Sequence, residues 1–196
     1  MPFFLYGRIL MDMELCWHGR GGQGVVTANE ILAETAIREG KYVKAFPEFG
    51  PERMGAPIRA FTRISPDPIR VHSQVYAPDA VIILDPTLVG KVKSITAGLK
   101  KSSVVIANYP GSPKELQEAL GTDVKCYAVD ATKISTEEIG RPMANTSMLG
   151  ALVKVSPIVS FSSLEDQMTS KFTGKLPDKI IVKNLSALKR AYAEVE

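Results

Sequence analysis

Cysteine and histidine are scarce in this chain of 196 residues, which contains two of each. One cysteine pair, Cys16 and Cys126, cannot build the disulfide framework on which small secreted domains depend. An ordinary iron–sulfur cluster takes four thiolate ligands, so this chain cannot hold one by itself. His18 and His72 add no recognisable zinc-ligand spacing. The sequence therefore predicts no metal site and gives no reason to expect secretion.

The chain also lacks a strong excess of charge of either sign. Its net charge is +3, and lysine and arginine are scattered along the sequence rather than clustered. This mild basicity suits an anionic ligand, but it is not the concentrated positive charge of a nucleic-acid-binding domain. We therefore expect no nucleic-acid partner.

Long hydrophobic runs are missing as well. Residues 1–13 are interrupted by Gly7 and Arg8, and they are too short for a signal peptide with its cleavage site or for a membrane span. We therefore expect no membrane association and a cytoplasmic location. Because Met11 and Met13 lie just before the first convincing strand, we interpret residues 1–13 as a leader or a disordered arm. Residues 14–196 are then long enough to form one domain with a sizeable core.

What the chain does contain is an alternation of strand and helix patterns. Residues 14–18 predict a short strand that runs into a glycine cluster. From Val25 onward apolar residues recur at helical spacing until Gly40, and residues 42–46 predict a second strand. Strand, tight turn, helix and strand are the opening of a βαβ unit, as in Rossmann-like domains.

The rest of the chain continues this pattern. Residues 58–64 and 69–76 alternate on either side of a proline-containing turn, which predicts an antiparallel β-hairpin. Further strands are expected at 81–84, 103–107 and 125–129, and helices at 93–99, 113–120, 147–155 (capped by Asn145 or Thr146) and from Pro177 onward. We therefore predict an α/β domain of three layers, with a mostly parallel sheet, a Rossmann-like opening and an inserted antiparallel hairpin.

The sharpest motif is the glycine loop between the first strand and the first helix. It satisfies the G-x-G-x-x-G spacing in the correct strand–turn–helix context. Without Cβ atoms its backbone N–H groups can approach a phosphate, and the helix N-terminus adds partial positive charge. An arginine in the loop can add a bidentate contact. The residues predicted to contact the ligand are Gly19, Arg20, Gly21, Gly22, Gln23 and Gly24. The alternative is a tight crossover whose glycines only let the helix pack close to the sheet.

The neighbourhood of the glycine loop argues against a nicotinamide dinucleotide. Such a site needs an acidic residue at the end of the second strand to hold the ribose. Here that strand ends at Phe46, and Glu48 follows only after Pro47. A Walker A lysine is also missing, since Val25 follows Gly24. The loop is therefore interpreted as a phosphate-binding loop that is not specific for NAD.

Asp85, Asn108 and Asp130 each follow an apolar run and should lie at the carboxyl ends of neighbouring strands. In open α/β sheets ligands bind at that edge. Each residue type also favours turns and helix caps, and capping is the interpretation we prefer. Because no nucleophile lies beside a base in the sequence, we predict no catalytic residue. For His18 a contact with ligand and a structural role are equally good explanations.

Three motifs occur in one order along the chain: WHGRGGQG at 17–24, AFPEFGPER at 45–53 with GAP at 55–57, and NTSMLG at 145–150. Together they resemble the gamma subunit, or POR domain, of pyruvate and related 2-oxoacid:ferredoxin oxidoreductases. The resemblance runs from about residue 14 to the C-terminus and leaves residues 1–13 outside.

The resemblance implies a subunit of an enzyme for oxidative decarboxylation. In that family thiamine diphosphate attacks the 2-oxoacid, electrons pass through 4Fe–4S clusters to ferredoxin, and coenzyme A takes the acyl group. The thiamine diphosphate and the clusters belong to other subunits or domains, of alpha, beta and delta type, whereas the gamma part is associated with coenzyme A and with assembly. For this chain the resemblance implies pyruvate as the expected 2-oxoacid. Joined to the phosphate-binding interpretation of the loop, it leads us to expect a coenzyme A pyrophosphate on residues 19–24. Because the chain has neither four cluster-ligating cysteines nor an evident thiamine diphosphate motif, we expect the isolated subunit to be inactive.

Two other functions stay open at this stage. One is a free-standing, nucleotide-dependent oxidoreductase of Rossmann type. The other is a purely structural subunit whose glycine loop binds nothing.

Residues 46–57 are rich in proline and glycine, which predicts a stiff loop without regular structure. Phe46, Phe49 and Met54 offer apolar anchors, and Arg53 offers a charged one. Aromatic and arginine side chains are typical interface hot spots. We interpret the segment as a docking loop for partner subunits. The alternative is a loop whose apolar side chains fold back on the domain's own sheet.

Overall fold

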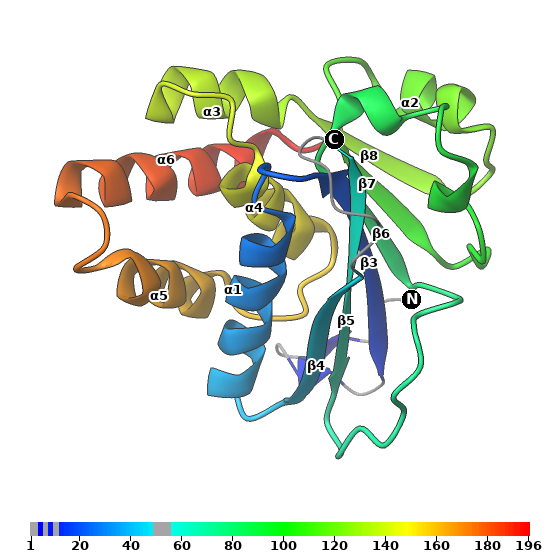
Figure 1. The fold of residues 1–196 in the computed structure, drawn as a ribbon, viewed down its shortest axis with the longest axis horizontal. Coiled ribbons are helices and arrows are strands. Elements are labelled where there is room, and N and C mark those ends of the chain that lie inside the picture. The colour runs from blue at the N-terminus through cyan, green and yellow to red at the C-terminus, as the bar shows by residue number, and fades with distance from the viewer. Residues whose placement is uncertain (1–3, 6–7, 10–11, 49–55) are drawn as a thin grey trace.

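The structure is a computed structural model that describes residues 4–5, 8–9, 12–48 and 56–196. Its centre is a sheet of six strands in the order β4-β5-β3-β6-β7-β8 (Figure 1). Strands β3, β6, β7 and β8 are parallel, and β5 runs antiparallel to both β3 and β4. The strands are β3 (Met13–Arg20), β4 (Tyr42–Glu48), β5 (Pro57–Ser65), β6 (Ala80–Ile83), β7 (Val104–Asn108) and β8 (Lys125–Val129). A separate two-residue pair, β1 (Phe4–Leu5) and β2 (Arg8–Ile9), precedes them.

Helices cover both faces of this sheet. The α-helices are α1 (Val25–Arg38), α2 (Pro113–Leu120), α3 (Ala131–Ile139), α4 (Asn145–Val155), α5 (Phe161–Phe172) and α6 (Asp178–Glu194), and two 3₁₀ turns are η1 (Pro86–Leu88) and η2 (Lys93–Ile95). Alternate residues of a strand point to opposite faces. In β6, Ile82 therefore joins the core under α1 and α3–α6, whereas Val81 and Ile83 join the core under α2. The predicted three-layer α/β class, mostly parallel, is confirmed (Figure 1).

The opening βαβ unit is split. α1 carries the chain from β3 to β4, but β5 lies between these two strands and is antiparallel to each. An antiparallel pair is therefore present in the sheet, but it is formed by β4 and β5 and not by residues 58–64 and 69–76 as predicted.

The predicted partner strand at 69–76 is wrong, because these residues form no strand. Both edges of β5 are already occupied by β3 and β4, so no hydrogen-bonding edge is left for a further strand. The guanidinium of Arg63 holds the segment instead, donating to the carbonyl oxygens of Ser73 at 2.6 Å and Gln74 at 2.8 Å.

The two ends of the predicted docking loop belong to strands. β4 continues through Pro47 to Glu48, and β5 begins at Pro57. Pro47 is tolerated because β4 is an edge strand, where a missing N–H costs no ladder hydrogen bond. Phe46 packs on Phe61 with ring centroids 5.5 Å apart, so this anchor folds back on the chain's own sheet. Residues 49–55, with the other proposed anchors, lie outside the described residues.

The helix predictions vary in quality. α2 has the predicted bounds and begins with a capping box formed by Ser112 and Glu115. The predicted cap of α4 is wrong, because Asn145 and Thr146 lie inside the helix and Ala144 is its N-cap. Residues 93–99 hold only the short turn η2. Neither α3 nor α5 was predicted from the sequence.

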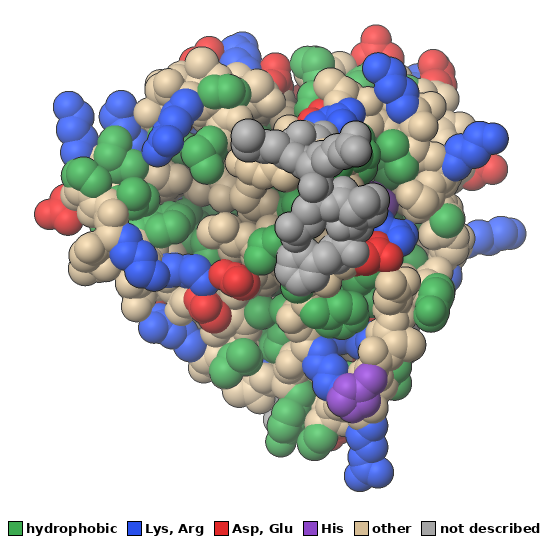
Figure 2. Space-filling view, viewed as in Figure 1, with side chains coloured by type: hydrophobic (Ala, Val, Ile, Leu, Met, Phe, Trp, Pro, Cys, Tyr) green, Lys and Arg blue, Asp and Glu red, His purple; other side chains and the backbone are tan. Residues whose placement is uncertain are grey.

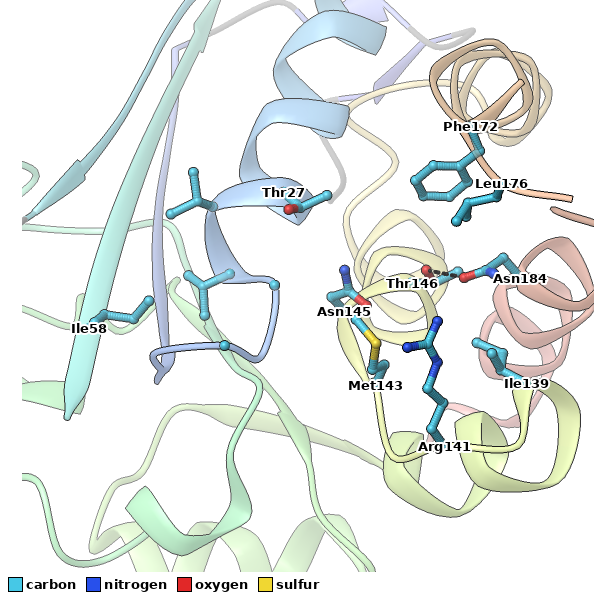
Figure 3. A pocket seen from close by; sticks show the side chains of 14 residues that line it. Thr27, Ile58, Ile139, Arg141, Met143, Asn145, Thr146, Phe172, Leu176 and Asn184 are labelled. Atoms are coloured by element: carbon cyan, nitrogen blue, oxygen red, sulfur yellow. Dashed lines mark hydrogen bonds between the residues drawn. The ribbon is translucent and has the colours of Figure 1, made fainter. Parts of the chain in front are cut away.

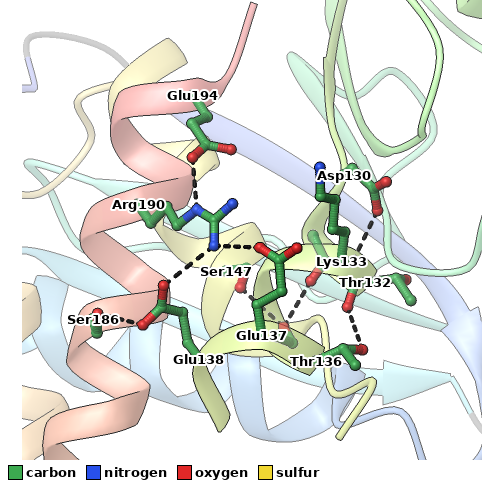
Figure 4. Close-up of polar contacts among 12 residues, drawn as sticks. Asp130, Thr132, Lys133, Thr136, Glu137, Glu138, Ser147, Ser186, Arg190 and Glu194 are labelled. Atoms are coloured by element: carbon green, nitrogen blue, oxygen red, sulfur yellow. Dashed lines mark hydrogen bonds and ion pairs between the residues drawn. The ribbon is translucent and has the colours of Figure 1, made fainter. Parts of the chain in front are cut away.

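Polar contacts fasten α6 to α3 (Figure 4). The guanidinium of Arg190 pairs with Glu137 at 2.6 Å, with Glu138 at 3.2 Å and with Glu194 at 2.6 Å. Ser186 donates to Glu138 at 2.7 Å. Exposed ion pairs of this kind contribute little individually, so packing of the apolar faces is the main source of stability here. Within the described residues, no helix is both long and apolar enough to cross a membrane.

Candidate functional site

The glycine loop joins β3 to α1, as predicted. Gly22 has φ of +90° and Gly24, the N-cap of α1, has φ of +76°, a conformation that favours glycine at both positions. Gly19 serves close packing, because a Cβ there would lie 2.4 Å from Cγ2 of Val25. The crossover interpretation thus rests on Gly19, and it does not exclude the phosphate interpretation, which concerns Gly22 and Gly24.

Much of the loop's hydrogen bonding is internal. The side-chain oxygen of Gln23 accepts from the Arg20 N–H at 2.8 Å, and the Gln23 N–H donates to the Arg20 carbonyl at 3.2 Å. The Gly21 N–H donates to the carbonyl of Ala56 at 3.2 Å. Within the described part of the chain, no acceptor faces the N–H groups of Gly22 and Gly24 or those of the first turn of α1. The donors that remain for a ligand therefore cluster at the helix N-terminus.

Asp85 is the residue that anchors the loop. Its carboxylate accepts from the amide of Gln23 at 2.6 Å and from the N–H of Thr87 at 2.8 Å, and it pairs with the guanidinium of Arg20 at 3.1 Å. Burial alone raises the pKa of this carboxyl, but hydrogen bonds from Thr87 and Gln23 and the charge of Arg20 outweigh burial and lower the pKa below its ordinary value. Asp85 is thus ionised at neutral pH and fixes two side chains of the loop.

The other predicted strand-end residues serve as caps and ties. Asp130 caps α3 by accepting from the N–H of Lys133 at 2.9 Å. The amide of Asn108 donates to the Leu84 carbonyl at 2.9 Å and accepts from the N–H of Thr132 at 3.1 Å. The capping interpretation is confirmed for Asp130 and for Asp85, which caps η1, whereas Asn108 joins the end of β7 to the first turn of α3.

A cavity of about 460 Å³ opens at the N-terminus of α1 (Figure 3). Gly22, Gly24 and the first turn of α1 form one wall. Residues from α3 to α6 and their connections form the opposite wall: Ile139, Arg141, Met143, Asn145, Thr146, Phe172, Leu176 and Asn184. The volume lies in the range of small-molecule sites, and the lining combines apolar side chains with a few polar ones, as such sites do.

Two of the three sequence motifs meet in this cavity. A Cβ on Gly24 would lie 2.5 Å from the amide nitrogen of Asn145, so the glycine loop and the segment that begins at Asn145 are in direct contact. The model for the family described as pyruvate ferredoxin/flavodoxin oxidoreductase matches residues 14–194. The chain belongs to this family.

Individual relatives agree with this assignment. The chain is similar to the common subunit gamma of the pyruvate/ketoisovalerate oxidoreductases of Pyrococcus furiosus, with 48% identity over 185 residues, 94% of this chain and 97% of the relative. Its fold matches the crystal structure of pyruvate oxidoreductase subunit PORC from Thermotoga maritima, with a TM-score of 0.85 and 40% identity over 95% of this chain and 98% of that chain. The predicted identity as a gamma subunit of a pyruvate or 2-oxoacid:ferredoxin oxidoreductase is confirmed.

A more distant match concerns the fold alone. The 2-oxoglutarate:ferredoxin oxidoreductase of Magnetococcus marinus has a TM-score of 0.76 and 23% identity over 93% of this chain, which corresponds to 31% of that chain. The gamma-subunit fold thus also occurs as one part of a longer polypeptide.

His18 and Cys16 of this gamma subunit are buried together on one face of β3. Cys16 Sγ lies 3.3 Å from His18 Nε2. Burial raises the pKa of the Cys16 thiol to about 12. Cys16 belongs to the core under α2, on the sheet face opposite α1, so neither side chain reaches the cavity. The burial of His18 within the described residues favours its structural role over a contact with a ligand in the cavity. Across the residues that the structure describes, no group of three His, Cys, Asp or Glu side chains could hold a metal ion.

Acidification is expected to destabilise the fold through His18. Burial, followed by the positive charge of Arg59, lowers the pKa of His18 from 6.5 to about 4. As the pH falls between these values, the unfolded chain takes up more protons than the folded chain. The stabilisation is therefore complete above pH 6.5, and about 3 kcal/mol is lost by pH 4.

Urea unfolding at pH 7 and at pH 4.5 measures this effect. His18→Gln should flatten the loss of stability between the two pH values, whereas His72→Gln, at an exposed position, should keep the wild-type slope. A His18→Gln chain that retains the wild-type slope would contradict the assignment.

Sequence reasoning missed three polar residues that line the cavity. Arg141 follows the C-cap of α3, Asn184 lies on α6, and Asn145 was interpreted as a cap. Only the NTSMLG segment signalled that Asn145 matters. Arg141 and Asn184 carry no local signal, because their place at the cavity depends on how α3 and α6 pack.

Proposed function

We propose that this gamma subunit supports the coenzyme A-dependent oxidative decarboxylation of a 2-oxoacid, with pyruvate as the expected substrate, by holding the coenzyme A pyrophosphate at the glycine loop. The observation that carries this proposal is a set of N–H groups at Gly22, Gly24 and the first turn of α1, which have no acceptor among the described residues and lie at the wall of the cavity. Such donors, together with the helix dipole, favour phosphate. The Magnetococcus marinus relative has coenzyme A and succinyl-CoA bound, which supports this choice of ligand.

The residues of the loop have different roles in this proposal. Gly22, Gly24 and the helix turn donate N–H groups, and Gly19 lets α1 approach β3. Gln23 shapes the loop through Asp85 and the Arg20 N–H, and Gly21 is tied to Ala56. The Arg20 guanidinium already pairs with Asp85, so Arg20→Ala should weaken coenzyme A use only mildly.

The redox cofactors are proposed to lie in partner subunits. Both cysteines are buried free thiols, which do not suit the four-thiolate ligation of a 4Fe–4S cluster. We therefore propose that alpha-, beta- and delta-type partners hold the thiamine diphosphate and the clusters and pass electrons to ferredoxin. Free thiols also suit the reducing cytoplasm, where we place the complex.

A dinucleotide-dependent oxidoreductase is disfavoured by the arrangement at β4. Because β5 separates β4 from β3, the end of β4 is not adjacent to the loop strand. Its acidic residue, Glu48, is paired with Arg59 and accepts from Gln74 at 2.9 Å. The Glu48 carboxylate is therefore already paired within the chain and is not available to bind a ribose.

The isolated chain is expected to be catalytically silent. Pure chain mixed with pyruvate, thiamine diphosphate, coenzyme A and an electron acceptor should not reduce the acceptor, whereas the complex reconstituted with its partner subunits should. Calorimetric titration of the isolated chain with coenzyme A separates our proposal from a purely structural subunit. Acceptor reduction by pure chain, or no binding of coenzyme A, would count against the proposal.

A further inference from the structure

We propose that Asn145 and Arg141 complete an anion site at the N-terminus of α1, and that the cavity takes a phosphorylated ligand whose apolar part lies against Phe172 and Leu176. The inference rests on the proposed function, since it deepens the description of the same site. Neither Asn145 nor Arg141 belongs to the glycine loop.

Asn145 carries the argument. The residue is only 6% exposed and lines the cavity, and its amide makes no hydrogen bond to any other described residue. Its neighbours on α4 are paired: Thr146 donates to Asn184 at 3.1 Å, and Ser147 lies 3.0 Å from the hydroxyl of Ser135. The amide atoms of Asn145 are not among the buried atoms left without a partner, so they are accessible from the cavity. A ligand in the cavity can therefore replace water on this amide.

The position of Gly24 explains why the Asn145 amide faces a ligand at the helix N-terminus. A Cβ on Gly24 would lie 2.5 Å from Nδ2 and 2.8 Å from Cγ of Asn145. The absence of a side chain therefore brings the amide against the first turn of α1. It also leaves the helix without a side-chain cap, so its N–H groups stay available. The amide and the helix N–H groups can then donate to the same anion.

Among the described residues that line the cavity, the only charge is positive. Arg141 lines the cavity and is the charged residue among its lining residues, which include no Asp or Glu in the described chain. In Figure 3 the side chain of Arg141 extends from the α3–α4 connection toward Asn145 and Thr146. Within the part of the chain that the structure describes, no hydrogen bond or ion pair occupies its guanidinium. A phosphoryl group matches both its charge and its fork of donors.

The remaining wall is apolar and sets the class of ligand. Ile139, Met143, Phe172 and Leu176 line the cavity around its polar end. A bare inorganic anion fills only that polar end. A phosphate ester with an organic group fills both, as in coenzyme A or another nucleotide.

The test uses the full chain in calorimetric titrations with coenzyme A and, separately, with inorganic pyrophosphate. Both should bind the wild-type chain, coenzyme A more tightly because it also reaches the apolar wall. Asn145→Asp places a negative charge beside the anion and should lower the affinity for both ligands by at least about tenfold. Arg141→Ala should lower the affinity for coenzyme A and for pyrophosphate by about tenfold and should make binding less sensitive to salt. The matched control is Arg38→Ala, at the opposite end of α1, which should bind as the wild type does.

Arg141 is exposed, so its variant keeps the test decisive even if Asn145→Asp fails to fold. Wild-type affinity in Arg141→Ala and in any folded Asn145→Asp chain, or no binding of either ligand to the wild-type chain, would overturn the inference. These variants could lose the binding of pyrophosphate while the complex assembled with them keeps the wild-type KM for coenzyme A. That result would support the anion site and contradict the proposed function. If these variants bind normally while glycine-loop variants impair coenzyme A use, the function stands and this inference fails.

Discussion

Replacing Gly150 by alanine is expected to lower the free energy of unfolding by about 3 kcal/mol or more, because it overpacks the contact between α4 and α6. A Cβ on Gly150 would lie 2.2 Å from the carbonyl oxygen of Leu188 and 3.2 Å from the backbone nitrogen of Tyr192. Backbone atoms cannot rotate away, so the two helices must separate. The cavity residues Thr146 and Asn184, which join these helices, should shift with them. Urea unfolding followed by circular dichroism measures the loss.

The control for this substitution is Gly40→Ala. Gly40 has φ of +78°, and no described residue has an atom within 4 Å of a Cβ built on it. The loss in the free energy of unfolding caused by Gly40→Ala should therefore come from the backbone conformation alone and amount to about 1 kcal/mol. If Gly150→Ala cost no more than Gly40→Ala, the close helix contact would not be important for stability.

Removing the Asp85 carboxylate should also have a large effect. Asp85→Ala leaves the Gln23 amide, the Thr87 N–H and the Arg20 guanidinium without their acceptor. We expect a loss of about 2 to 3 kcal/mol in the free energy of unfolding, lessened by the access of Arg20 to water. Coenzyme A use by the assembled complex should weaken as well, because the glycine loop loses its anchor.

One further variant separates charge from shape at Asp85, and a variant of another aspartate serves as the control. Asp85→Asn keeps an acceptor for Thr87 and should lose less stability than Asp85→Ala. Asp67→Ala, at an exposed aspartate, should stay within about 0.5 kcal/mol of the wild type. Equal stability of Asp85→Ala and Asp67→Ala in urea unfolding would contradict the anchoring role.

Elements defined by neighbouring residues could be predicted from the sequence. α2 lies between a capping box and a terminal glycine, and β8 is a short run before Asp130, so both were predicted with their observed bounds. The glycine loop was recognisable because its strand and helix flank it directly. In contrast, α5 is rich in serine and threonine, which are weak helix formers, and its stability comes from the burial of Leu164 and Met168.

Features that depend on distant contacts could not be predicted. The alternation in residues 69–76 suits a strand, but the fold leaves no free edge beside β5. Asn145 precedes an apolar run, the usual place of a cap, yet its role depends on contact with Gly24, far away in the sequence. Arg141 reaches the cavity only because α3 and α6 pack beside α4. The spacing of residues along the sequence carries no information about contacts between distant segments.

The most direct test of our central claim is the coenzyme A dependence of the assembled complex with Gly22→Val. Among the described residues nothing lies within 4 Å of a Cβ on Gly22. Valine there strains the loop at φ of +90° and intrudes where a phosphate would approach. Gly40→Val, also at positive φ with open space, controls for the strain alone. The account predicts that only Gly22→Val raises the apparent KM for coenzyme A, by about tenfold or more, while decarboxylation before acyl transfer continues. An unchanged KM in a folded, assembled Gly22→Val complex would contradict it.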